Sequence, residues 1–158
     1  YVLEKTGQHK VLIFSQFVAM LNVIRHKLEE ENVVYEYLDG STKDRKERVE
    51  RFQTDEKCRV FLISLKAGGV GLNLTEADYV FLVDPWWNPQ VEQQAIDRTH
   101  RIGQTKNVFA YKMICKDTIE EKVLKLQEKK KGIARDLISS EKSFVKNLTK
   151  NDIEDLFS

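Results

Sequence analysis

A pair of arginines, Arg98 and Arg101, follows Gln94 at helical intervals of four and three residues. This spacing puts the three side chains on one face of a helix. Two guanidinium groups one turn apart form a planar set of donors that suits a terminal phosphate, a geometry that lysine does not reproduce. The spacing alone leaves open a solvent-exposed face in which Asp97 pairs with Arg101.

A second group of chemistry-bearing residues falls in four loops that follow apolar or strand-like segments. The loops are Ser15-Gln16, Asp39–Thr42, Ser64–Asn73 and Asp84–Pro89. Their hydroxyls and glycine amides can donate to phosphate oxygens. Any one of them alone is compatible with ordinary turn chemistry. Four together at strand ends favour a phosphate-binding surface.

The glycines Gly68, Gly69 and Gly71 do not make a known nucleotide motif. A leucine, Leu74, stands where the dinucleotide fingerprint needs its third glycine. No Gly-Lys-Ser or Gly-Lys-Thr occurs, so the chain lacks the usual means of holding Mg²⁺ and the β- and γ-phosphates. Its histidines and cysteines show no metal-ligand spacing, and we expect no metal site.

The elements that must position these loops alternate between strand and helix. Short apolar runs predict buried parallel strands at Val11–Phe14, Val60–Ile63 and Val80–Val83, and weaker patterns predict strands at Tyr35–Leu38 and Val108–Ile114. Strands that alternate with helices indicate an α/β domain with a parallel sheet. Ligands of such sheets collect at the carboxyl ends of the strands, where the four loops fall.

Helical patterns separate the strands. One apolar stripe joins residues three and four apart, namely Phe17, Met20, Leu21, Ile24 and Leu28. A charged helix is predicted over Lys43–Phe52, with Ser41 placed three residues before Asp44 as at a helix start. Thr118 and Glu121 match a capping box.

Composition bounds the function classes. The chain has 158 residues, of which 41% are hydrophobic and 32% charged, as in one globular domain. No apolar run approaches the ~20 residues that span a bilayer, so we expect no membrane partner. The net charge of +1 argues against a strongly cationic nucleic-acid binder. Cys58 and Cys115 are expected to be reduced thiols in buried packing.

Four segments in order carry a resemblance to a known family. They are KVLIFSQF (10–17), YLDGST (37–42), SLKAGGVGLNLTEADYVFLVDPWWNP (64–89) and QAIDRTHRIGQ (94–104). Together they resemble the second RecA-like lobe of the Swi/Snf family of helicase-related ATPases, and the DPWWNP form resembles bacterial members. The resemblance covers at least Lys10 to Leu137.

The resemblance implies a fold and a mechanism. The fold would be a RecA-like parallel sheet with helices on both faces and a C-terminal helical extension. Members are two-lobed motors that bind ATP between the lobes and move along double-stranded DNA. ATP and Mg²⁺ would be held mainly by the N-terminal RecA-like lobe of the same protein. This chain alone, expected to be a monomer, would not hydrolyse ATP.

The resemblance also assigns residues. Arg98 and Arg101 would be catalytic, with Arg101 closest to the arginine finger. The nucleotide would contact Gly71, Asn73 and Gln94. The DNA backbone would contact Gln16, Gly40, Ser41, Thr42, Ser64 and Lys66, with Trp87 beside the DNA. Many members carry arginine where this chain has Lys66, so a bidentate phosphate contact is in question there.

The predicted organisation has a lobe core over 1–115, a brace-like helix over 116–140 and a tail over 141–158. The first residues read like the end of a preceding helix, so we expect a fragment of a longer protein. A bacterial protein would be cytoplasmic and nucleoid-associated, and a eukaryotic one nuclear. Two alternatives stay open, an RNA helicase lobe and a non-enzymatic nucleic-acid-binding module.

Overall fold

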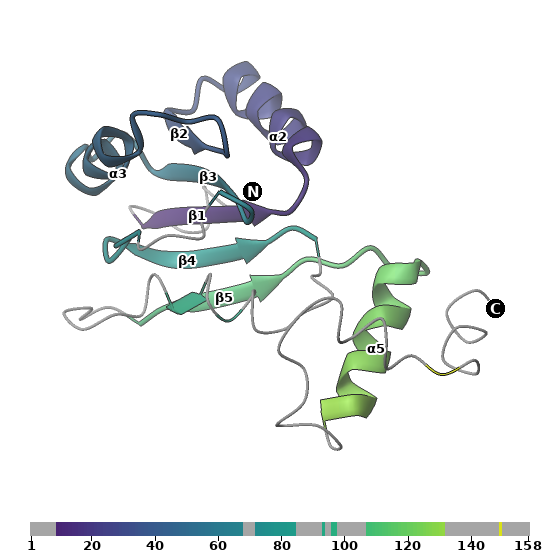
Figure 1. Cartoon of the computed structure of the whole chain (residues 1–158). Coiled ribbons are helices and arrows are strands. Elements are labelled where there is room, and N and C mark those ends of the chain that lie inside the picture. Colours follow the sequence, from purple (N-terminus) through teal and green to yellow (C-terminus); the bar gives the residue numbers. More distant parts are fainter. Residues whose placement is uncertain are drawn as a thin grey trace.

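The computed structural model describes residues 9–67, 72–84, 93, 96–97, 107–131 and 149. Strands and helices alternate in the first part of the chain (Figure 1). The elements are β1 (Lys10–Ser15), α2 (Val18–Glu30), β2 (Tyr35–Leu38), α3 (Arg45–Thr54), β3 (Val60–Ser64), β4 (Ala77–Leu82), β5 (Phe109–Lys112) and α5 (Ile119–Lys131).

The five strands form one sheet in the order β2-β3-β1-β4-β5, and every neighbouring pair is parallel. The predicted parallel α/β sheet is therefore confirmed. The weakly patterned strand Tyr35–Leu38 has the predicted bounds. The strand predicted at Val80–Val83 begins three residues earlier, at Ala77, and ends at Leu82.

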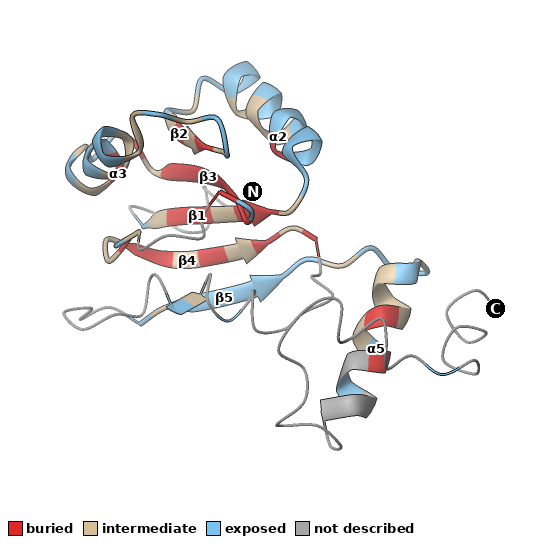
Figure 2. Cartoon of the chain, in the orientation of Figure 1, coloured by how far each residue is buried: buried red, intermediate tan, exposed pale blue. Residues whose placement is uncertain are grey.

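Helices cover both faces of the sheet. On one face, Leu21 of α2 packs with Val60 and Leu62 of β3. On the other face, Phe52 of α3 packs with Phe61 and other core residues. Because successive strand residues point to opposite faces, a strand covered on both sides is apolar throughout. All five residues of β3 are buried accordingly (Figure 2).

The apolar stripe predicted on α2 is only partly packed. Leu21 is fully buried, and Ile24 and Leu28 pack around it. Phe17 and Met20 instead are 57% and 40% exposed, so their place in the stripe is wrong. Helical spacing identifies one face of a helix, but the sheet covers only the part of that face that begins at Leu21.

Two helix starts use other hydrogen bonds than the predicted caps. α3 begins at Arg45 after Asp44, and Ser41 does not cap it because the Ser41 hydroxyl donates to Asp39. α5 begins at Ile119 as the Thr118 motif predicts, but the Thr118 hydroxyl donates to the carbonyl oxygen of Cys115, 2.8 Å away. Local sequence thus located both starts within two residues.

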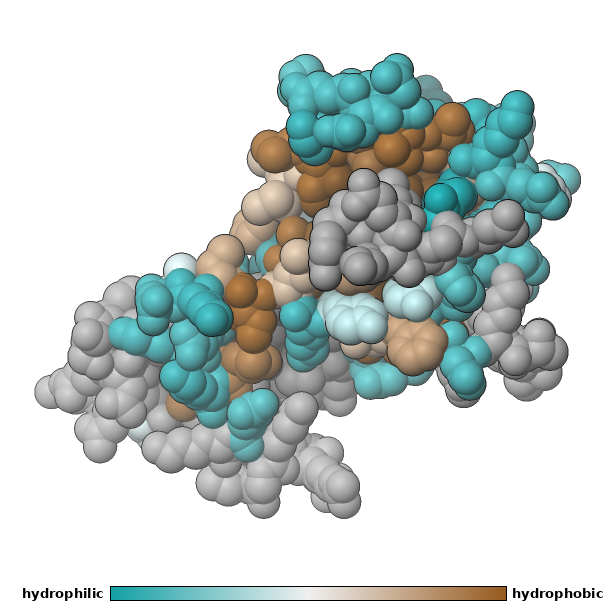
Figure 3. All heavy atoms as spheres, turned by 180° about the vertical axis from the view of Figure 1, so that it is seen from behind, coloured by the Kyte–Doolittle hydropathy of each residue, from teal (hydrophilic) through white to brown (hydrophobic). Residues whose placement is uncertain are grey.

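The described part of α5 is amphipathic. Val123 and Leu126 are buried, whereas Lys125 is exposed and pairs with Glu121 at 3.0 Å. Seen from behind in Figure 3, hydrophilic residues lie along the outer side of the helix and a hydrophobic band lies toward the sheet. The remainder of the predicted helix, to Leu137, lies outside the described residues.

The outer strand β2 carries a buried charge. Glu36 is 3% exposed, and its carboxylate pairs with Arg48 at 3.2 Å and Arg51 at 2.9 Å, both on α3. A buried carboxylate is tolerated when cations and hydrogen bonds compensate for lost hydration. The pair of arginines therefore lets this edge strand bury an acidic side chain under α3.

The two cysteines differ. Cys58 is buried, and burial raises the pKa of its thiol to about 11. Cys115 is exposed at the turn before α5, so the expectation that both thiols are buried is wrong for Cys115.

Candidate nucleic-acid interface at the carboxyl edge of the sheet

Backbone hydrogen bonds join three strand ends at one edge of the sheet. The Leu65 N–H after β3 donates to the Ser15 carbonyl oxygen at 2.9 Å, and the Val83 N–H after β4 donates to the Phe14 carbonyl oxygen at 3.0 Å. Because all strands are parallel, their following loops emerge together. The described first residues of these loops therefore lie together, as predicted.

A carboxylate ties the end of β1 to the end of β4. Asp84 is 4% exposed and accepts hydrogen bonds from the Ser15 hydroxyl and, at 2.8 Å, from the Gln16 N–H. The Gln16 side chain also donates to it. The Ser15 oxygen in turn accepts from the Phe17 N–H at 3.0 Å. Asp84 thus fixes the loop that carries Gln16.

Burial dominates the ionisation of this carboxyl group. Removal from water raises the pKa of Asp84 above its ordinary value, and the negative charge of Glu120 on α5 adds to the rise. The hydrogen bonds from Ser15 and Gln16 act in the opposite direction without cancelling the burial. Asp84 is therefore a carboxylate whose charge is costly to keep.

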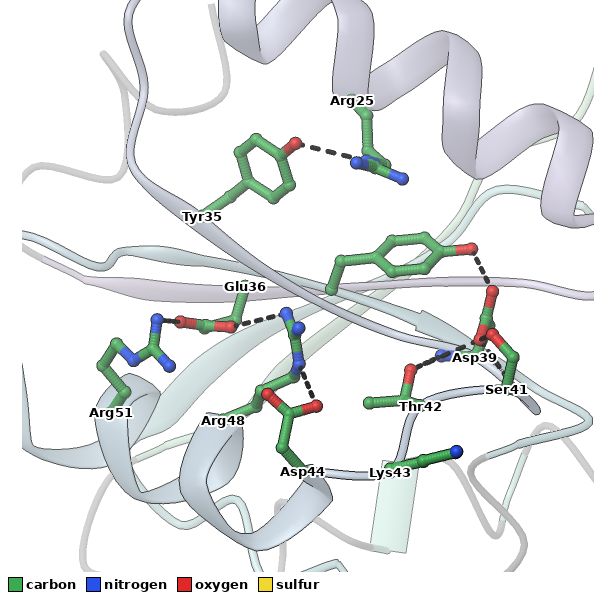
Figure 4. A pocket seen from close by; sticks show the side chains of 11 residues that line it. Arg25, Tyr35, Glu36, Asp39, Ser41, Thr42, Lys43, Asp44, Arg48 and Arg51 are labelled. Atoms are coloured by element: carbon green, nitrogen blue, oxygen red, sulfur yellow. Dashed lines mark hydrogen bonds and ion pairs between the residues drawn. The ribbon is translucent and has the colours of Figure 1, made fainter.

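A second aspartate organises the turn between β2 and α3 (Figure 4). One Asp39 carboxylate oxygen accepts from the Ser41 N–H at 2.8 Å, the Ser41 hydroxyl at 2.6 Å and the Thr42 hydroxyl at 3.3 Å. The other oxygen accepts from the Tyr37 hydroxyl at 2.9 Å. The Thr42 N–H donates to the Asp39 carbonyl oxygen at 3.2 Å. The donors of this turn therefore point at Asp39.

These donors hold Asp39 in its ionised form. The Ser41 hydroxyl makes the largest contribution, and together the donors lower the pKa of Asp39 to about 2. The pKa of Tyr37, the tyrosine that donates to Asp39, shifts in the opposite direction. Burial, helped by the hydrogen bond to Asp39, raises the pKa of Tyr37 to about 12. The turn thus contains a carboxylate that is ionised at neutral pH and stays so until the pH falls toward about 2.

An arginine links this turn to the loop after β3. Arg45 donates to the Thr42 carbonyl oxygen at 3.0 Å, to the Gly40 carbonyl oxygen at 3.4 Å and to the Ala67 carbonyl oxygen at 3.2 Å. Its fork of donors suits several carbonyl oxygens at once. Arg45 therefore holds two of the predicted phosphate-binding loops in a fixed relation.

A hollow of about 500 Å³ opens beside the Asp39 turn. Its wall combines cations, acids and tyrosines, and comprises Arg25, Tyr35, Glu36, Tyr37, Asp39, Ser41, Thr42, Lys43, Asp44, Arg48 and Arg51. Arg48 pairs with Glu36 and Asp44, and Arg25 lies over the Tyr37 ring at 4.6 Å. Lys43 is exposed and makes no hydrogen bond or ion pair within the described part of the chain.

The predicted DNA contacts separate into distinct environments. Gln16, the Gly40–Thr42 turn and Lys66 lie in loops at the carboxyl edge of the sheet. Ser64 is there too but is buried. Asn73, which was predicted to contact the nucleotide, lies apart from these predicted DNA contacts, and its carbonyl oxygen accepts from Gln53 at the C-terminal end of α3. Five predicted residues lie outside the described part of the chain, namely Gly71, Trp87, Gln94, Arg98 and Arg101.

Several organising residues were missed by sequence reasoning. It placed Ser15, Asp39 and Asp84 in the four loops but gave none of them a role as an organiser, and it passed over Arg45. One signal was available for two of them, an aspartate just beyond the end of a strand. Asp39 directly follows β2, and Asp84 comes two residues after β4. Arg45 carried no such signal, because the acceptor that links the two loops, the Ala67 carbonyl oxygen, lies 22 residues away along the chain.

The described residues offer no site for a metal ion and no membrane span. Among them, no group of three or more His, Cys, Asp or Glu side chains could ligate a metal, and no helix is long and apolar enough to cross a bilayer. Asp39 and Asp84 do not suit Mg²⁺, because internal donors already occupy their carboxylate oxygens.

Comparison with known proteins identifies the family. Residues 1–103 match the helicase conserved C-terminal domain, which is more than half of the chain. The chain belongs to that family. This helicase C-terminal domain is 52% identical over 134 residues to the DNA repair protein rad8 of Schizosaccharomyces pombe. The match covers 84% of the chain and 12% of rad8.

Other matches of this helicase C-terminal domain support the Swi/Snf branch. It is 47% identical over 137 residues to the chromatin-remodeling ATPase INO80 of Mus musculus, covering 85% of the chain and 9% of that protein. The crystal structure of the C-terminal part of the Fun30 ATPase domain matches with a TM-score of 0.74 and 42% identity, over 79% of this chain and 40% of that chain.

These matches confirm the RecA-like fold class and correct one expectation. The relatives come mostly from eukaryotes, so the bacterial origin inferred from DPWWNP is not supported. The helicase C-terminal domain spans only about a tenth of the length of rad8 and INO80. The activity of a whole protein is therefore a matter for proposal.

Proposed function

We propose that this helicase C-terminal domain is the second lobe of an ATP-dependent translocase on double-stranded DNA. Its partners are the DNA and the N-terminal RecA-like lobe of the same protein, which holds ATP and Mg²⁺ for the most part. The observation that carries the proposal is the linked edge of the sheet, where Asp84 and Arg45 join four strand ends into one surface. In a eukaryote such a protein works in the nucleus.

The proposal assigns the arginines to the nucleotide. Arg98 and Arg101 act on the ATP phosphates, with Arg101 as the finger that neutralises charge in the transition state. Three described neighbours support a helix there, because Gln93, Ile96 and Asp97 are helical and Ile96 packs against the core. Asp97 accepts from the Gln93 side chain at 2.8 Å, which competes with a pairing between Asp97 and Arg101.

The DNA contacts of the Asp39 turn need a refinement. The hydroxyl hydrogens of Ser41 and Thr42 are directed at Asp39, and an anionic Asp39 repels a phosphate. Ser41 and Thr42 therefore shape the turn, and the phosphate contact comes from the adjacent Lys43. Lysine serves this role as a point charge that needs no fixed geometry.

The opening and closing of the two lobes follow from a difference in their affinity for ATP. A closed pair of lobes binds ATP better than an open pair, so nucleotide binding shifts the population toward closure. Hydrolysis removes that preference and the lobes reopen. Because phosphate contacts are independent of sequence and sensitive to salt, the lobe can release and regain the backbone at successive positions.

ATP hydrolysis tests the split active site. We expect no turnover by this chain alone and DNA-stimulated turnover when the N-terminal lobe is joined to it. In the two-lobed protein, Arg101→Ala should lower kcat by roughly 10³-fold or more and leave DNA affinity within about 2-fold. Hydrolysis by the chain alone at ordinary enzyme rates, or full turnover by the variant, contradicts the proposal.

The same protein separates the alternatives. A DNA translocase is stimulated by double-stranded DNA more than by RNA of equal length, whereas an RNA helicase lobe shows the reverse. A non-enzymatic binding module binds tightly without its N-terminal partner and has no ATPase activity that depends on Arg101. Stimulation by RNA alone would replace the DNA assignment.

A further inference from the structure

Helix α3 holds two separate points of the segment that joins β3 to β4. At its first residue, Arg45 donates to the Ala67 carbonyl oxygen at 3.2 Å, shortly after β3 ends. Near its last residue, the Gln53 side chain donates to the Asn73 carbonyl oxygen at 3.3 Å and accepts from the Glu76 N–H at 3.1 Å. Both ends of the segment are therefore attached to the same helix.

The core fixes α3 itself. Phe52 of this helix is fully buried, and its ring centroid lies 5.2 Å from that of Phe61 on β3. Leu74 of the attached segment is fully buried in the same core cluster. Because protein interiors are close-packed, the helix cannot shift without disturbing these contacts. α3 is therefore a fixed support for the segment.

The two attachment points lie beside residues with different assignments. The family resemblance assigns the exposed Lys66, next to Ala67, to the DNA backbone. It makes the same assignment for the Gly40–Thr42 turn, whose carbonyl oxygens Arg45 also binds. It assigns Asn73, at the other attachment point, to the nucleotide. Residues 45 and 53 are about 12 Å apart along the helix axis, at 1.5 Å per residue.

We propose that Arg45 and Gln53 are positioning residues, the first for the DNA contacts of the lobe and the second for its nucleotide contact. The inference rests on the proposed function, because it concerns the same DNA and the same ATP. Arg45 keeps Lys66 and the Gly40–Thr42 turn in one arrangement, and Gln53 holds the backbone of Asn73. Loops that are ordered before binding lose less conformational entropy when the ligand arrives.

The two-lobed protein tests the role of Arg45. Arg45→Lys keeps the charge but loses the fork of donors that reaches three carbonyl oxygens. We expect the DNA concentration for half-maximal ATPase activity to rise about 2- to 12-fold, the cost of immobilising one flexible side chain, with the KM for ATP unchanged. An unchanged DNA requirement, or a rise in the KM for ATP alone, overturns the proposal.

The same protein tests the role of Gln53. Gln53→Met keeps the length of the side chain and removes its hydrogen-bonding amide. We expect the KM for ATP to rise about 2- to 12-fold, with the DNA requirement unchanged. Each variant is thus a control for the other, because a general loss of stability would change both quantities in both variants. An equal change of both quantities in either variant overturns the proposal.

Arg48→Lys is the matched control on the same helix. Arg48 is half-buried like Arg45, but its described partners are Glu36 and Asp44 rather than the segment after β3. We expect its DNA requirement and its KM for ATP to match those of the wild type. A rise in DNA requirement equal to that of Arg45→Lys would assign the effect to any altered arginine of α3 and would overturn the proposal.

Carbonyl-carbon chemical shifts of the 158-residue chain test the two attachments without DNA or ATP. The shift of Ala67 should change in Arg45→Lys and that of Asn73 in Gln53→Met, because each carbonyl loses a hydrogen-bond donor. The other carbonyl should keep its wild-type shift, which also shows that the variant is folded. Unchanged shifts at Ala67 and Asn73 in their respective variants overturn the proposal.

Failure of the proposed function gives a different result. In that case the wild-type two-lobed protein shows no turnover that DNA stimulates, whatever the chemical shifts report. Normal DNA stimulation in the wild type, together with an unaltered DNA requirement in Arg45→Lys and an unaltered KM for ATP in Gln53→Met, would leave the proposed function standing and overturn the positioning roles alone.

Discussion

Two aspartates organise two loops at the same edge of the sheet, and their environments are opposite. Asp39 lies in an exposed turn, where hydrogen-bond donors lower its pKa to about 2. Asp84 lies under the ends of β1 and β4, where burial raises its pKa despite its own donors. The first loop is thus built around a stable charge, and the second around a charge that burial makes costly.

The difference shows what each loop is suited to do. The Asp39 turn can exchange its hydrogen bonds with water, so it is a local device that shapes a few residues. The Asp84 site is buried, so water does not readily replace the carboxylate as the acceptor of its hydrogen bonds. The comparison predicts that removing Asp84 lowers the stability of the whole fold, whereas removing Asp39 mainly loosens its own turn.

The largest expected effect is that of Asp84→Ala on stability. The variant removes the buried carboxylate that accepts from the Ser15 hydroxyl and the Gln16 N–H, and we expect a loss of about 3 kcal/mol in the free energy of unfolding. Urea unfolding of the 158-residue chain followed by circular dichroism measures it. A loss below about 1 kcal/mol would mean that water reaches the site and would remove the contrast with Asp39.

Asp39→Ala should have a smaller effect. Water can satisfy the donors of Ser41 and Thr42, so we expect a loss of about 1 kcal/mol in the same measurement. Thr54→Ala is a suitable control, since among the described residues its hydroxyl bonds only to the carbonyl oxygen of Glu50 on the same helix, at 2.9 Å. An equal loss in the free energy of unfolding for Asp39→Ala and Asp84→Ala would contradict the difference between the two sites.

The pH dependence should differ in sign. Because the pKa of Asp39 is depressed in the folded state, its contribution to stability is full above its unfolded pKa of ~3.9 and is lost as the pH falls toward about 2. Because the pKa of Asp84 is raised, its contribution is most favourable below ~3.9 and declines as the pH rises through the folded pKa.

Unfolding at several pH values separates these two contributions. The stability of wild type minus that of Asp39→Asn should shrink as the pH falls below ~4, whereas wild type minus Asp84→Asn should grow as the pH falls toward ~4. Slopes of the same sign would show that one of the two environments is assigned wrongly.

The smallest effect on stability is expected for Lys43→Ala, which removes an exposed side chain without a described partner. Its effect should appear in DNA binding by the two-lobed protein instead. The slope of log K against log salt concentration should fall by about 1 in magnitude. Ser41→Ala should leave the slope unchanged, and Lys46→Ala, an exposed lysine on α3, is the matched control. A changed slope in Ser41→Ala would return the contact to the hydroxyl.

Much of the fold was accessible from the sequence because the apolar runs are strong. The run at Val60–Ile63 contains no polar residue, so it clearly predicts a buried strand. Because the carboxyl ends of parallel strands lie at one edge of a sheet, the four loops could then be placed at that edge. The prediction failed where a neighbour decides the outcome. Phe17 and Met20 continue the apolar period of α2 but extend past the surface that the sheet covers.

The candidate site was accessible in part. Motif resemblance selected Gln16 and the Gly40–Thr42 turn, which the fold places at the expected edge. It did not show that the hydroxyls of that turn are directed at Asp39, since this depends on the rotamers that a local network selects. Nor did it show the Asp84 contacts, which join residues 68 and 69 positions apart.

The buried Glu36 on the outer strand has a consequence for how the chain behaves at high concentration. A free strand edge is a template on which another chain can add a strand and start an aggregate. Glu36, with Arg48 and Arg51 around it, places a charge that points inward beneath that edge. An incoming strand would have to disturb this ion cluster, so edge-to-edge self-association is disfavoured on the β2 side.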